Sequence, residues 1–490
     1  MNNIMKKLLI IFLLFFVESI SAQEKIITLD EAIKIAQKQS PDYIRLLNSN
    51  QRSYWRYRNY EAGFLPQLRF DGTLPQYFNS TRRLTDDNGQ DIFVRSNQAS
   101  YEGTLSLNQN LALTGGTFSV ASTLERVDVF GANESTGYSV IPFSLRYNQN
   151  SLFYNEFKWD KKIEPLVYEE SKRQFVESME DISLNTSRRY FALLKAQMQN
   201  KISQKNLSNQ DTLFQIAKGR FKMGKIAEND LLQMELSLLN SQNSLVTNEI
   251  ELKRASQNLA RYLELNTENL ELNIPKELNT FNVTIEKSLQ EAQSNRKEVL
   301  AFRRRRLEAE KRVAEVKGSN KLQLSLNANF GISQQGQVFN DLFQNYNQQQ
   351  SVSLRVGIPL VDWGVSKSRR KLVEADLDLV NNNIDQEKEA FEQEILLHTL
   401  NWQNQRNFLE TAKKAEEIAT RRYEITKKRF ILGKITITDL NLALEEKDRS
   451  VLTYLNSLEK FWVDYYTLRK LTLYDFETDK KIVTEDILYD

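Results

Sequence analysis

The sequence lacks cysteine altogether and has a single histidine, His398, among its 490 residues. The absence of cysteine excludes disulfides, thiol chemistry and an acylated N-terminal cysteine, and most metal sites lose their usual ligands. A hydrolase needs a nucleophile, a base and an acid together, and no such set stands out. We therefore expect no catalytic residues, no cofactor and no metal site, and we interpret His398 as a packed or surface side chain.

Long hydrophobic runs and strong net charge are also missing. The formal net charge of +2 gives no reason to expect nucleic acid as a partner. No segment after the N-terminal region offers the roughly 20 apolar residues of a membrane-spanning helix. If the mature protein spans a membrane, we expect it to do so with strands.

The N-terminal region has the pattern of a secretory signal peptide, residues 1–22. Lys6 and Lys7 precede an apolar run of ten residues from Leu8 to Val17, and small residues follow before Gln23. Such a run is too short to span a bilayer. The alternative is a retained membrane anchor.

The chain has only 16 glycines and 7 prolines, and two of these glycines mark a duplication. Residues 220–226 read Arg-Phe-Lys-Met-Gly-Lys-Ile, and residues 429–435 read Arg-Phe-Ile-Leu-Gly-Lys-Ile, 209 positions later. Each segment interrupts about a hundred residues of helical sequence. Because glycine accepts the left-handed conformation that ends a helix, each segment predicts a turn between two long antiparallel helices.

The helical segments repeat in the same order in both halves. We expect a helix from the cap Thr28, with Glu31 three residues on, to Gly63, and a matching one over 284–317. Pro41 is a candidate position for a kink in the first helix. Outgoing helices are predicted over 163–219 and 366–428, with return helices to Leu265 and Leu473. On the return helices apolar residues recur every seven positions, as in supercoiled helices packed along a partner. These residues are Leu231, Leu238, Leu245, Leu252 and Leu259, then Leu444, Val451, Leu458 and Tyr465.

Alternating apolar and polar residues predict strands in both halves. The second half has such segments around 322–330 and 352–358, separated by a polar loop over 334–350. The first half has them around Leu68–Phe70 and 141–147. Between these it carries about 47 additional residues with a Thr114-Gly115-Gly116 turn, which predict an extra hairpin. The alternative for this insertion is an irregular polar loop.

A sheet with one apolar face can span a membrane only if it closes, and six strands are too few for a channel. We therefore expect several chains to pool their strands. Aromatic residues gather where strand passes into helix, as an interfacial girdle would require. These are Phe153, Tyr154, Phe157, Trp159 and Trp363. Ordinary core packing at this junction is the other interpretation.

From Thr28 to Tyr474 the chain resembles the TolC-like outer-membrane efflux proteins. The resemblance rests on Leu29-Asp30-Glu31-Ala32 with Ser40-Pro41, on residues 358–364 (Ile-Pro-Leu-Val-Asp-Trp-Gly), and on both glycine turns within the duplicated order of elements. It implies a mainly α fold with a membrane β-barrel. The duplicated unit would be a helix, a strand pair and a long helical hairpin, and a trimeric α-barrel tunnel would continue into a shared β-barrel.

The resemblance also implies a division of the chain. After the signal peptide, the first structural repeat would cover 23–274 with strands at about 66–150, and the second would cover 275–476 with strands at about 321–359. A tail would occupy 477–490. Family members use four strands per copy, so the extra hairpin would give six, or eighteen per trimer, if it joins the wall.

By resemblance, the protein would be a homotrimeric exit duct of a tripartite efflux or type I secretion system. It would lie in the outer membrane, in contact with lipid, and extend far into the periplasm. It would be a passive conduit and not an enzyme, and its partners would be a periplasmic adaptor and an inner-membrane pump. The adaptor would dock on the turns, although their residues could instead serve the turn alone. The docking residues are Arg220, Phe221, Gly224, Lys225, Ile226, Arg429, Phe430, Gly433, Lys434 and Ile435.

Two aspartates just beyond the turns are candidates for a constriction of the lumen. Family members carry lumen-facing aspartates near this place on the second hairpin, and Asp439 falls on one such position while Leu442 occupies the other. Threefold symmetry would make each aspartate a ring of three negative charges. The alternative for Asp439, and more so for Asp230, is a charge that favours the N-terminus of the return helix.

Other interpretations account for less of the sequence. A structural periplasmic coiled coil with a soluble β cap does not explain why strands with an apolar face recur in both halves. An adaptor protein would carry one helical hairpin with lipoyl-like β segments, whereas this chain has two. The basic run Arg303–Arg306 is expected to be a solvated or salt-bridged helix face.

Overall fold

The computed structural model describes residues 25–85, 89–131, 134–266, 269–276, 281–320 and 322–483. The expected signal peptide, residues 1–22, lies outside this part of the chain, as does the end of the expected tail. The chain forms two compact units. A sheet unit comprises Asn50–Lys172 and Lys297–Ala390, and a helical unit comprises the described residues up to Ser49, Arg173–Arg296 and the described residues from Phe391 to 483. Both halves of the sequence contribute to each unit.

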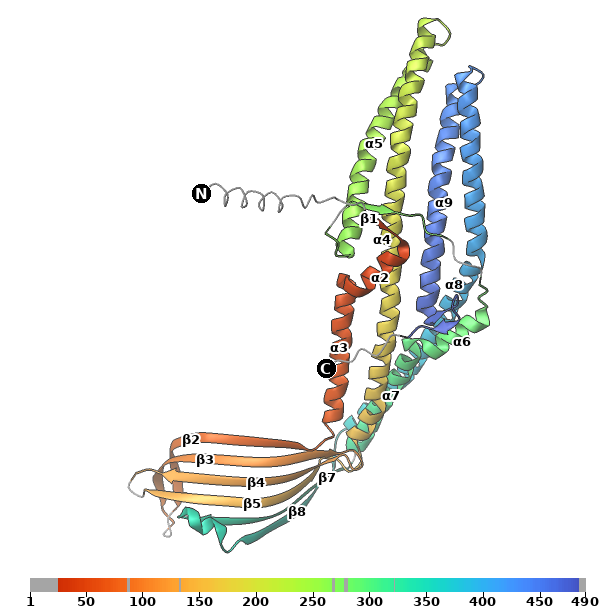
Figure 1. Ribbon diagram of the computed structural model, residues 1–490. Helices are drawn as coiled ribbons and strands as arrows, with labels where there is room; N and C mark the ends of the chain where they lie inside the picture. The colour runs from red at the N-terminus through yellow and green to blue at the C-terminus, as the bar shows by residue number, and fades with distance from the viewer. Residues whose placement is uncertain are drawn as a thin grey trace, which may run out of the picture. The chain divides into compact units, whose positions relative to one another are not determined.

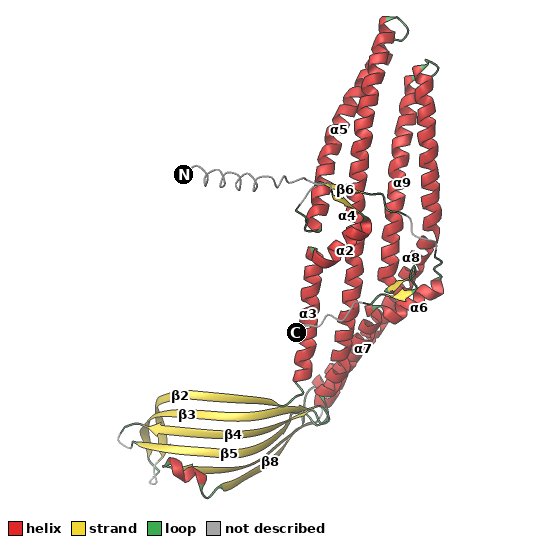
Figure 2. Ribbon diagram, in the orientation of Figure 1, coloured by secondary structure: helices red, strands yellow, loops and turns green. Residues whose placement is uncertain are grey.

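The sheet unit contains one antiparallel sheet in the order β2-β3-β4-β5-β7-β8 (Figures 1 and 2). All neighbouring strands pair antiparallel. The bounds are β2 Gln67–Thr85, β3 Asp91–Leu111, β4 Gly116–Val129, β5 Ser135–Gln149, β7 Gln323–Gly336 and β8 Asn347–Gly357. The predicted extra hairpin is therefore confirmed as β3 and β4, which lie inside the sheet and not apart from it. The turn between them has Gly115 at φ +85°.

The strand register separates an apolar face from a polar one. Leu68 pairs with Leu107, Leu107 with Val120, Val120 with Leu145, and Leu145 with Phe330, so one apolar row crosses five strands. In the alternate rows the side chains point to the other face. Arg69 pairs with Ser106 in one such row, and Asn327 pairs with Ser353 in another. In the single chain much of the apolar face is exposed. Leu68 and Val352, for example, are 69% and 77% exposed.

The prediction of a polar loop over 334–350 is wrong about the length of the loop. β7 continues to Gly336, β8 begins at Asn347, and the 3-10 helix η1 (Phe339–Phe343) lies between them. Gln348 and Gln350 pair with Ile332 and Phe330. Backbone ladders form irrespective of side-chain polarity, which is why glutamine-rich sequence could be mistaken for a loop.

Helices flank the sheet in sequence. α3 (Pro41–Ala62) precedes β2, and α7 (Lys297–Ser319) precedes β7. The two long helices α4 (Glu156–Lys222) and α8 (Val365–Ile431) follow β5 and β8, and each has 67 residues. The predicted proline kink takes the form of a break, because α2 (Leu29–Gln39) ends before Ser40 and Pro41 begins α3. Proline suits the first position of a helix, where its missing N–H is not needed.

The basic run on α7 is salt-bridged, as predicted. Arg304 contacts Glu170 at 2.7 Å and Glu308 at 3.1 Å, and Arg305 pairs with Glu387. These contacts join α7 to the first parts of α4 and α8 inside the sheet unit.

The helical unit combines the second parts of α4 and α8 with α5 (Glu228–Tyr262), α6 (Ile285–Asn295) and α9 (Ile437–Thr472). Its core includes Tyr190, Phe191, Leu259 and Leu458, all with fully buried side chains. Two short strands, β1 (Lys25–Ile27) and β6 (Leu270–Leu272), pair in parallel beside it. Thr28 and Glu31 form the predicted capping box of α2.

Among the described residues, none of the helices is long and apolar enough to cross a membrane.

Candidate functional site

The two predicted turns lie at the ends of α4 and α8 (Figure 1), and they have the same backbone geometry. In each, the glycine N–H donates to the phenylalanine carbonyl at 2.8 Å, from Gly224 to Phe221 and from Gly433 to Phe430. The following lysine N–H bonds to the arginine carbonyl, at 2.9 Å in the first turn and 3.0 Å in the second. Both glycines have positive φ, +66° and +75°. Glycine tolerates this left-handed conformation best, and in it the N–H groups of the turn bond to the last carbonyls of the helix.

The side chains of the two turns differ, although their sequences are nearly the same. The Arg220 guanidinium donates from Nη2 to the carbonyl oxygen of Ile431 at 2.8 Å and approaches that of Phe430 at 3.4 Å. Its Cζ also lies 5.6 Å from the centre of the Phe430 ring. Arg220 therefore binds the negative end of α8 and joins the two turns. The equivalent Arg429 is exposed, and the described part of the chain shows no such bond from it.

A small hydrophobic cluster, called here the turn core, lies behind the two turns and contains residues of all four long helices. It buries Leu213, Met234, Tyr423, Phe430 and Leu440. Burial raises the pKa of Tyr423 to about 12. The turns are thus supported by packing as well as by the Arg220 bridge.

The ten expected docking residues divide by exposure. Phe221, Gly224, Lys225, Arg429, Gly433 and Lys434 are exposed. Arg220 is half-buried and forms the bridge, while Ile226 and Ile435 pack against the turn core. Phe430 is only 4% exposed and belongs to that core. In this arrangement Phe430 supports the turn and leaves the surface to the six exposed residues.

Asp439 and Asp230 occupy equivalent places but make different contacts. Asp439 forms a capping box with Thr436. Its carboxylate accepts from the Thr436 hydroxyl at 2.7 Å and from the Thr436 N–H at 3.2 Å. These hydrogen bonds hold the pKa of the Asp439 carboxyl below its usual range. Asp230 lies in the first turn of α5, where its charge suits the helix N-terminus, but the cap residue Ala227 makes no side-chain cap bond. Asp439 is exposed and Asp230 is half-buried.

The aromatic residues at the junction of strand and helix fall into two environments. Phe157 packs edge-on against Phe64 at 5.5 Å, and the Lys162 ammonium lies 5.0 Å from the centre of the Trp159 ring. Tyr154 is half-buried, whereas Phe153 is exposed. Trp363 is 95% exposed. Within the single chain, therefore, Phe153 and Trp363 belong to no core, whereas Phe157, Trp159 and Tyr154 are partly buried.

The turn at Trp363 is built by its neighbour Asp362, whose role the sequence did not reveal. The Asp362 carboxylate accepts hydrogen bonds from the N–H groups of Gly364 at 2.9 Å and Ser366 at 3.0 Å. It thereby caps α8 and holds Trp363 at φ +50°.

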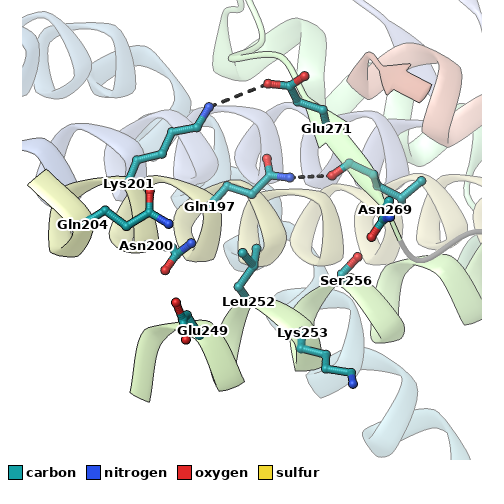
Figure 3. Close-up of a pocket in the computed structure, with 11 residues that line it drawn as sticks. Gln197, Asn200, Lys201, Gln204, Glu249, Leu252, Lys253, Ser256, Asn269 and Glu271 are labelled. Carbon is teal, nitrogen blue, oxygen red and sulfur yellow. Dashed lines mark hydrogen bonds and ion pairs between the residues drawn. The ribbon is translucent and has the colours of Figure 1, made fainter. Parts of the chain in front are cut away.

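A groove between α4 and α5 is a further feature without a sequence signal (Figure 3). It lies in the helical unit, is open to solvent and has a volume of about 700 Å³. Most of its lining residues are polar or charged, with Leu252 and Leu270 as apolar members, and they come from two helices, from β6 and from Asn269 just before β6. Only the folded chain brings these segments together.

Comparisons with known proteins agree on one architecture. Residues 288–468 match the family described as outer membrane efflux protein. Solved structures with the same fold include the outer membrane channel CmeC of Campylobacter jejuni, at 13% identity and a TM-score of 0.65, over 93% of this chain and 87% of that one. The open MtrE outer membrane channel of Neisseria gonorrhoeae aligns at 11% identity and a TM-score of 0.59, over 93% and 91%. A membrane protein from Pseudomonas aeruginosa aligns at 13% identity and a TM-score of 0.65, over 93% and 92%. No curated protein sequence matches the chain.

Proposed function

We infer that this chain is a TolC-like outer membrane efflux protein, which forms a channel of the outer membrane with a long periplasmic extension. Residues 288–468 match that family, and nearly the whole chain has the fold of solved outer-membrane channels. The observation that carries this inference within the molecule is the six-stranded sheet with one mainly apolar face, on which an apolar row crosses five strands. Such a face suits lipid, and the polar face suits a water-filled lumen.

We propose that three copies assemble and close their sheets into one wall. The sheet of a single copy ends at β2 and β8, and open sheet edges are not tolerated in lipid. Pairing β2 of each copy with β8 of the next would satisfy both edges and give eighteen strands from three copies. In this proposal β3 and β4 form part of the wall, because they lie between β2 and β5 in the sheet.

Exposed apolar stripes on the helices favour the same assembly. On α5, Leu232, Leu239 and Val246 recur at intervals of seven and are more than half exposed. On α8, Ile418 and Ile425 do the same, and Leu432, seven residues further, lies exposed in the turn directly after α8. Stripes of this kind on a single chain mark contact surfaces, and the spacing of seven fits helices that pack lengthwise against the next copy.

For the turns we propose a docking role toward a periplasmic adaptor that connects the duct to an inner-membrane pump. The surface offered is the set of six exposed turn residues defined above, with Arg220 and the turn core as its support. Lys225, Arg429 and Lys434 make this surface basic, so acidic side chains on the partner would complement it.

We further propose that Asp439, and secondarily Asp230, lines the periplasmic entrance of the conduit. The low pKa of Asp439 keeps its carboxylate ionised, and the side chain is exposed. A ring of three such charges would attract cations. The chain itself would carry out no chemistry, and the pump would supply the energy for transport.

The conduit is tested by single-channel recording of the purified, detergent-extracted protein in planar bilayers. Stable, cation-preferring steps are expected. Asp439→Asn should reduce the cation preference, whereas Asp230→Asn should have the smaller effect. Folded protein that never inserts would contradict the channel and favour a structural coiled coil. Steps that ignore both substitutions would refute the acidic entrance alone.

A further inference from the structure

Three arginines of the sheet unit lie on its polar face, near the strand ends that adjoin the helices (Figure 1). They are Arg69 on β2, Arg146 on β5 and Arg355 on β8, and all three are exposed. Because side chains alternate along a strand, a residue at an odd distance from an apolar-face residue of its own strand lies on the polar face. The apolar-face residues that place these arginines are Leu68, Leu145 and Val352.

The strands are staggered, and the register gives the size of the stagger. One row of paired residues runs from Gln67 on β2 through Arg146 on β5 to Ser351 on β8. β2 begins in that row, whereas β5 continues three residues beyond it to Gln149, and β8 continues six residues beyond it to Gly357. Six residues over five strand spacings correspond to about 20 Å against about 24 Å, which is a tilt of about 40°. Strands of closed sheets in membranes have this tilt.

The stagger brings the three arginines to nearly the same height in the sheet. Counted from the helix-side end of its own strand, Arg69 and Arg355 each lie two residues in, and Arg146 lies three residues in. One residue corresponds to about 3.3 Å of strand. If three copies close their sheets, nine arginines therefore share one level of the lumen. This level, formed by Arg69, Arg146 and Arg355 of each copy, is called here the arginine belt.

Two of the three arginines are unpaired in the folded chain. Arg69 lies 2.5 Å from the Asp71 carboxylate. Arg146 and Arg355 have no ion pair and no side-chain hydrogen bond among the described residues, and both side chains are exposed. An unpaired guanidinium group keeps all its N–H donors available to a ligand. Three copies would therefore supply six free guanidinium groups at this level.

The surroundings of the arginine belt on the polar face hold little negative charge. Beyond Asp71, the nearest acids on this face of the described sheet are Glu102 and Glu125, nine residues from the helix-side ends of β3 and β4. That separation is roughly 30 Å along a strand. The other polar-face residues within three positions of the helix-side strand ends are uncharged, namely Gln67, Asn108, Asn110, Thr117, Ser119, Asn148, Gln323, Ser325 and Gly357. The belt is thus a positively charged level in a neutral stretch of wall.

The width of the closed sheet decides which anions the belt can hold. Eighteen strands about 4.8 Å apart and tilted by about 40° give a wall radius of roughly 18 Å. An extended arginine side chain covers about 7 Å of this, so the guanidinium groups lie about 11 Å from the axis. Charges are screened over about 8 Å at physiological ionic strength. A monovalent anion on the axis is therefore held weakly, whereas an anion with several charges can bind at the wall.

The spacing of Arg146 and Arg355 within one copy suits such an anion. Two strand spacings and four residues of register separate them, so their Cα atoms lie roughly 16 Å apart. Their long side chains can approach one another across this gap and leave room for an anion a few ångströms long. Guanidinium groups bind phosphate and carboxylate groups with two parallel hydrogen bonds.

We propose that the arginine belt binds multivalent anions on their way through the duct, namely solutes that carry two or more phosphate or carboxylate groups. Rings of arginine or lysine have this function in pores that conduct anions. This inference rests on the proposed conduit and adds a class of cargo to it. The belt lies in the sheet unit and Asp439 lies in the helical unit, so the two act on ions of opposite sign at different places.

The test uses the full detergent-extracted protein in planar bilayers, with tripolyphosphate as the multivalent anion. Tripolyphosphate added to either side in turn should interrupt the single-channel current, whereas the neutral trisaccharide maltotriose should not. Raising the salt to about 1 M should relieve the block, because the screening length then falls to about 3 Å.

Variants connect the block to the belt. Arg146→Gln and Arg355→Gln should each raise the blocking concentration about threefold, as expected for the loss of one exposed ion pair, and the double variant about tenfold. Arg146→Lys and Arg355→Lys should retain most of the block because the charge remains. The matched control is Arg126→Gln on β4, six residues from Val120 and therefore on the apolar face, and it should be blocked like the unaltered protein.

The outcomes separate the belt from the conduit. Steps that tripolyphosphate does not interrupt refute the belt and leave the conduit intact. Block that survives the double variant, or that Arg126→Gln weakens equally, overturns the assignment to Arg146 and Arg355. Equal block by maltotriose shows obstruction by size and overturns the charge argument. The step size in plain salt reports whether each variant folds and inserts, and folded protein without any steps refutes the conduit and the belt with it.

Discussion

The Arg220 bridge allows a sharp test of how the two turns are held together. Arg220 donates to the carbonyl oxygens at the end of α8, whereas the equivalent Arg429 on the other turn does not. Truncation to alanine removes charge-assisted hydrogen bonds and a favourable contact with the helix dipole. After discounting for partial exposure, this loss amounts to about 1.5 kcal/mol. Because about 1.4 kcal/mol is a factor of ten, local opening of the second turn should become about tenfold more frequent.

Hydrogen exchange measures that opening directly. In Arg220→Ala, the Gly433 and Lys434 amides, which bond to Phe430 and Arg429, should exchange about tenfold faster. Arg429→Ala, at the matched position, should leave the amides of Gly224 and Lys225 unchanged. Equal effects of the two substitutions, or no effect of Arg220→Ala, would refute the assigned asymmetry.

Three further predictions follow from particular contacts. Thr436→Ala should destabilise α9 by about 1 kcal/mol, because it removes the N-cap side chain of that helix. Hydrogen exchange of the first α9 amides should then be faster, and unchanged exchange would contradict the cap. Because folding lowers the pKa of Asp439, its ionised carboxylate stabilises the folded turn above the ordinary carboxyl pKa, and this stabilisation is lost as the pH falls through the lowered pKa. Proteolysis at the turn should therefore rise on acidification in the unaltered protein and change less in Asp439→Asn. Gly116→Ala should reduce assembly into the outer membrane, because a Cβ there would lie 2.8 Å from the Asn148 carbonyl oxygen. Gly137→Ala, where a Cβ would meet no atom within 4 Å, should assemble normally. Equal yields of the two variants would contradict the packing around Gly116.

Much of the fold follows from periodic or duplicated sequence. The glycine turns, the capping box at Thr28 and the hairpin of β3 and β4 each have a local signature, and the structure contains them all. The short parallel pair of β1 and β6 could not be predicted, because three residues show no period. It depends on Tyr190, whose single hydroxyl donor lies within hydrogen-bond distance of the carbonyl oxygens of Ile27 and Asn273, far away in the sequence.

The candidate site was predictable in position but not in detail. The turn residues repeat almost identically, yet Arg220 forms a bridge and Arg429 is exposed, because only one arginine faces the end of the other hairpin. Phe221 and Phe430 differ in the same way, since one is exposed and the other lies in the turn core. The α4–α5 groove has no local signature, because its lining combines two helix faces and a strand.

The central claim is that copies of this chain close one sheet by pairing β2 with β8, and cysteine cross-linking in native outer membranes tests it most directly. The chain has no cysteine of its own, so each introduced pair is the only one present. Within one sheet β2 and β8 are separated by five strand spacings, roughly 24 Å, whereas a disulfide requires Cα atoms within about 7 Å. A cysteine at Phe70 combined in turn with cysteines at 350–356 should give a covalent three-chain species for positions in register, and none for those out of register. Single chains throughout, or dimers that never extend to three, would contradict the account.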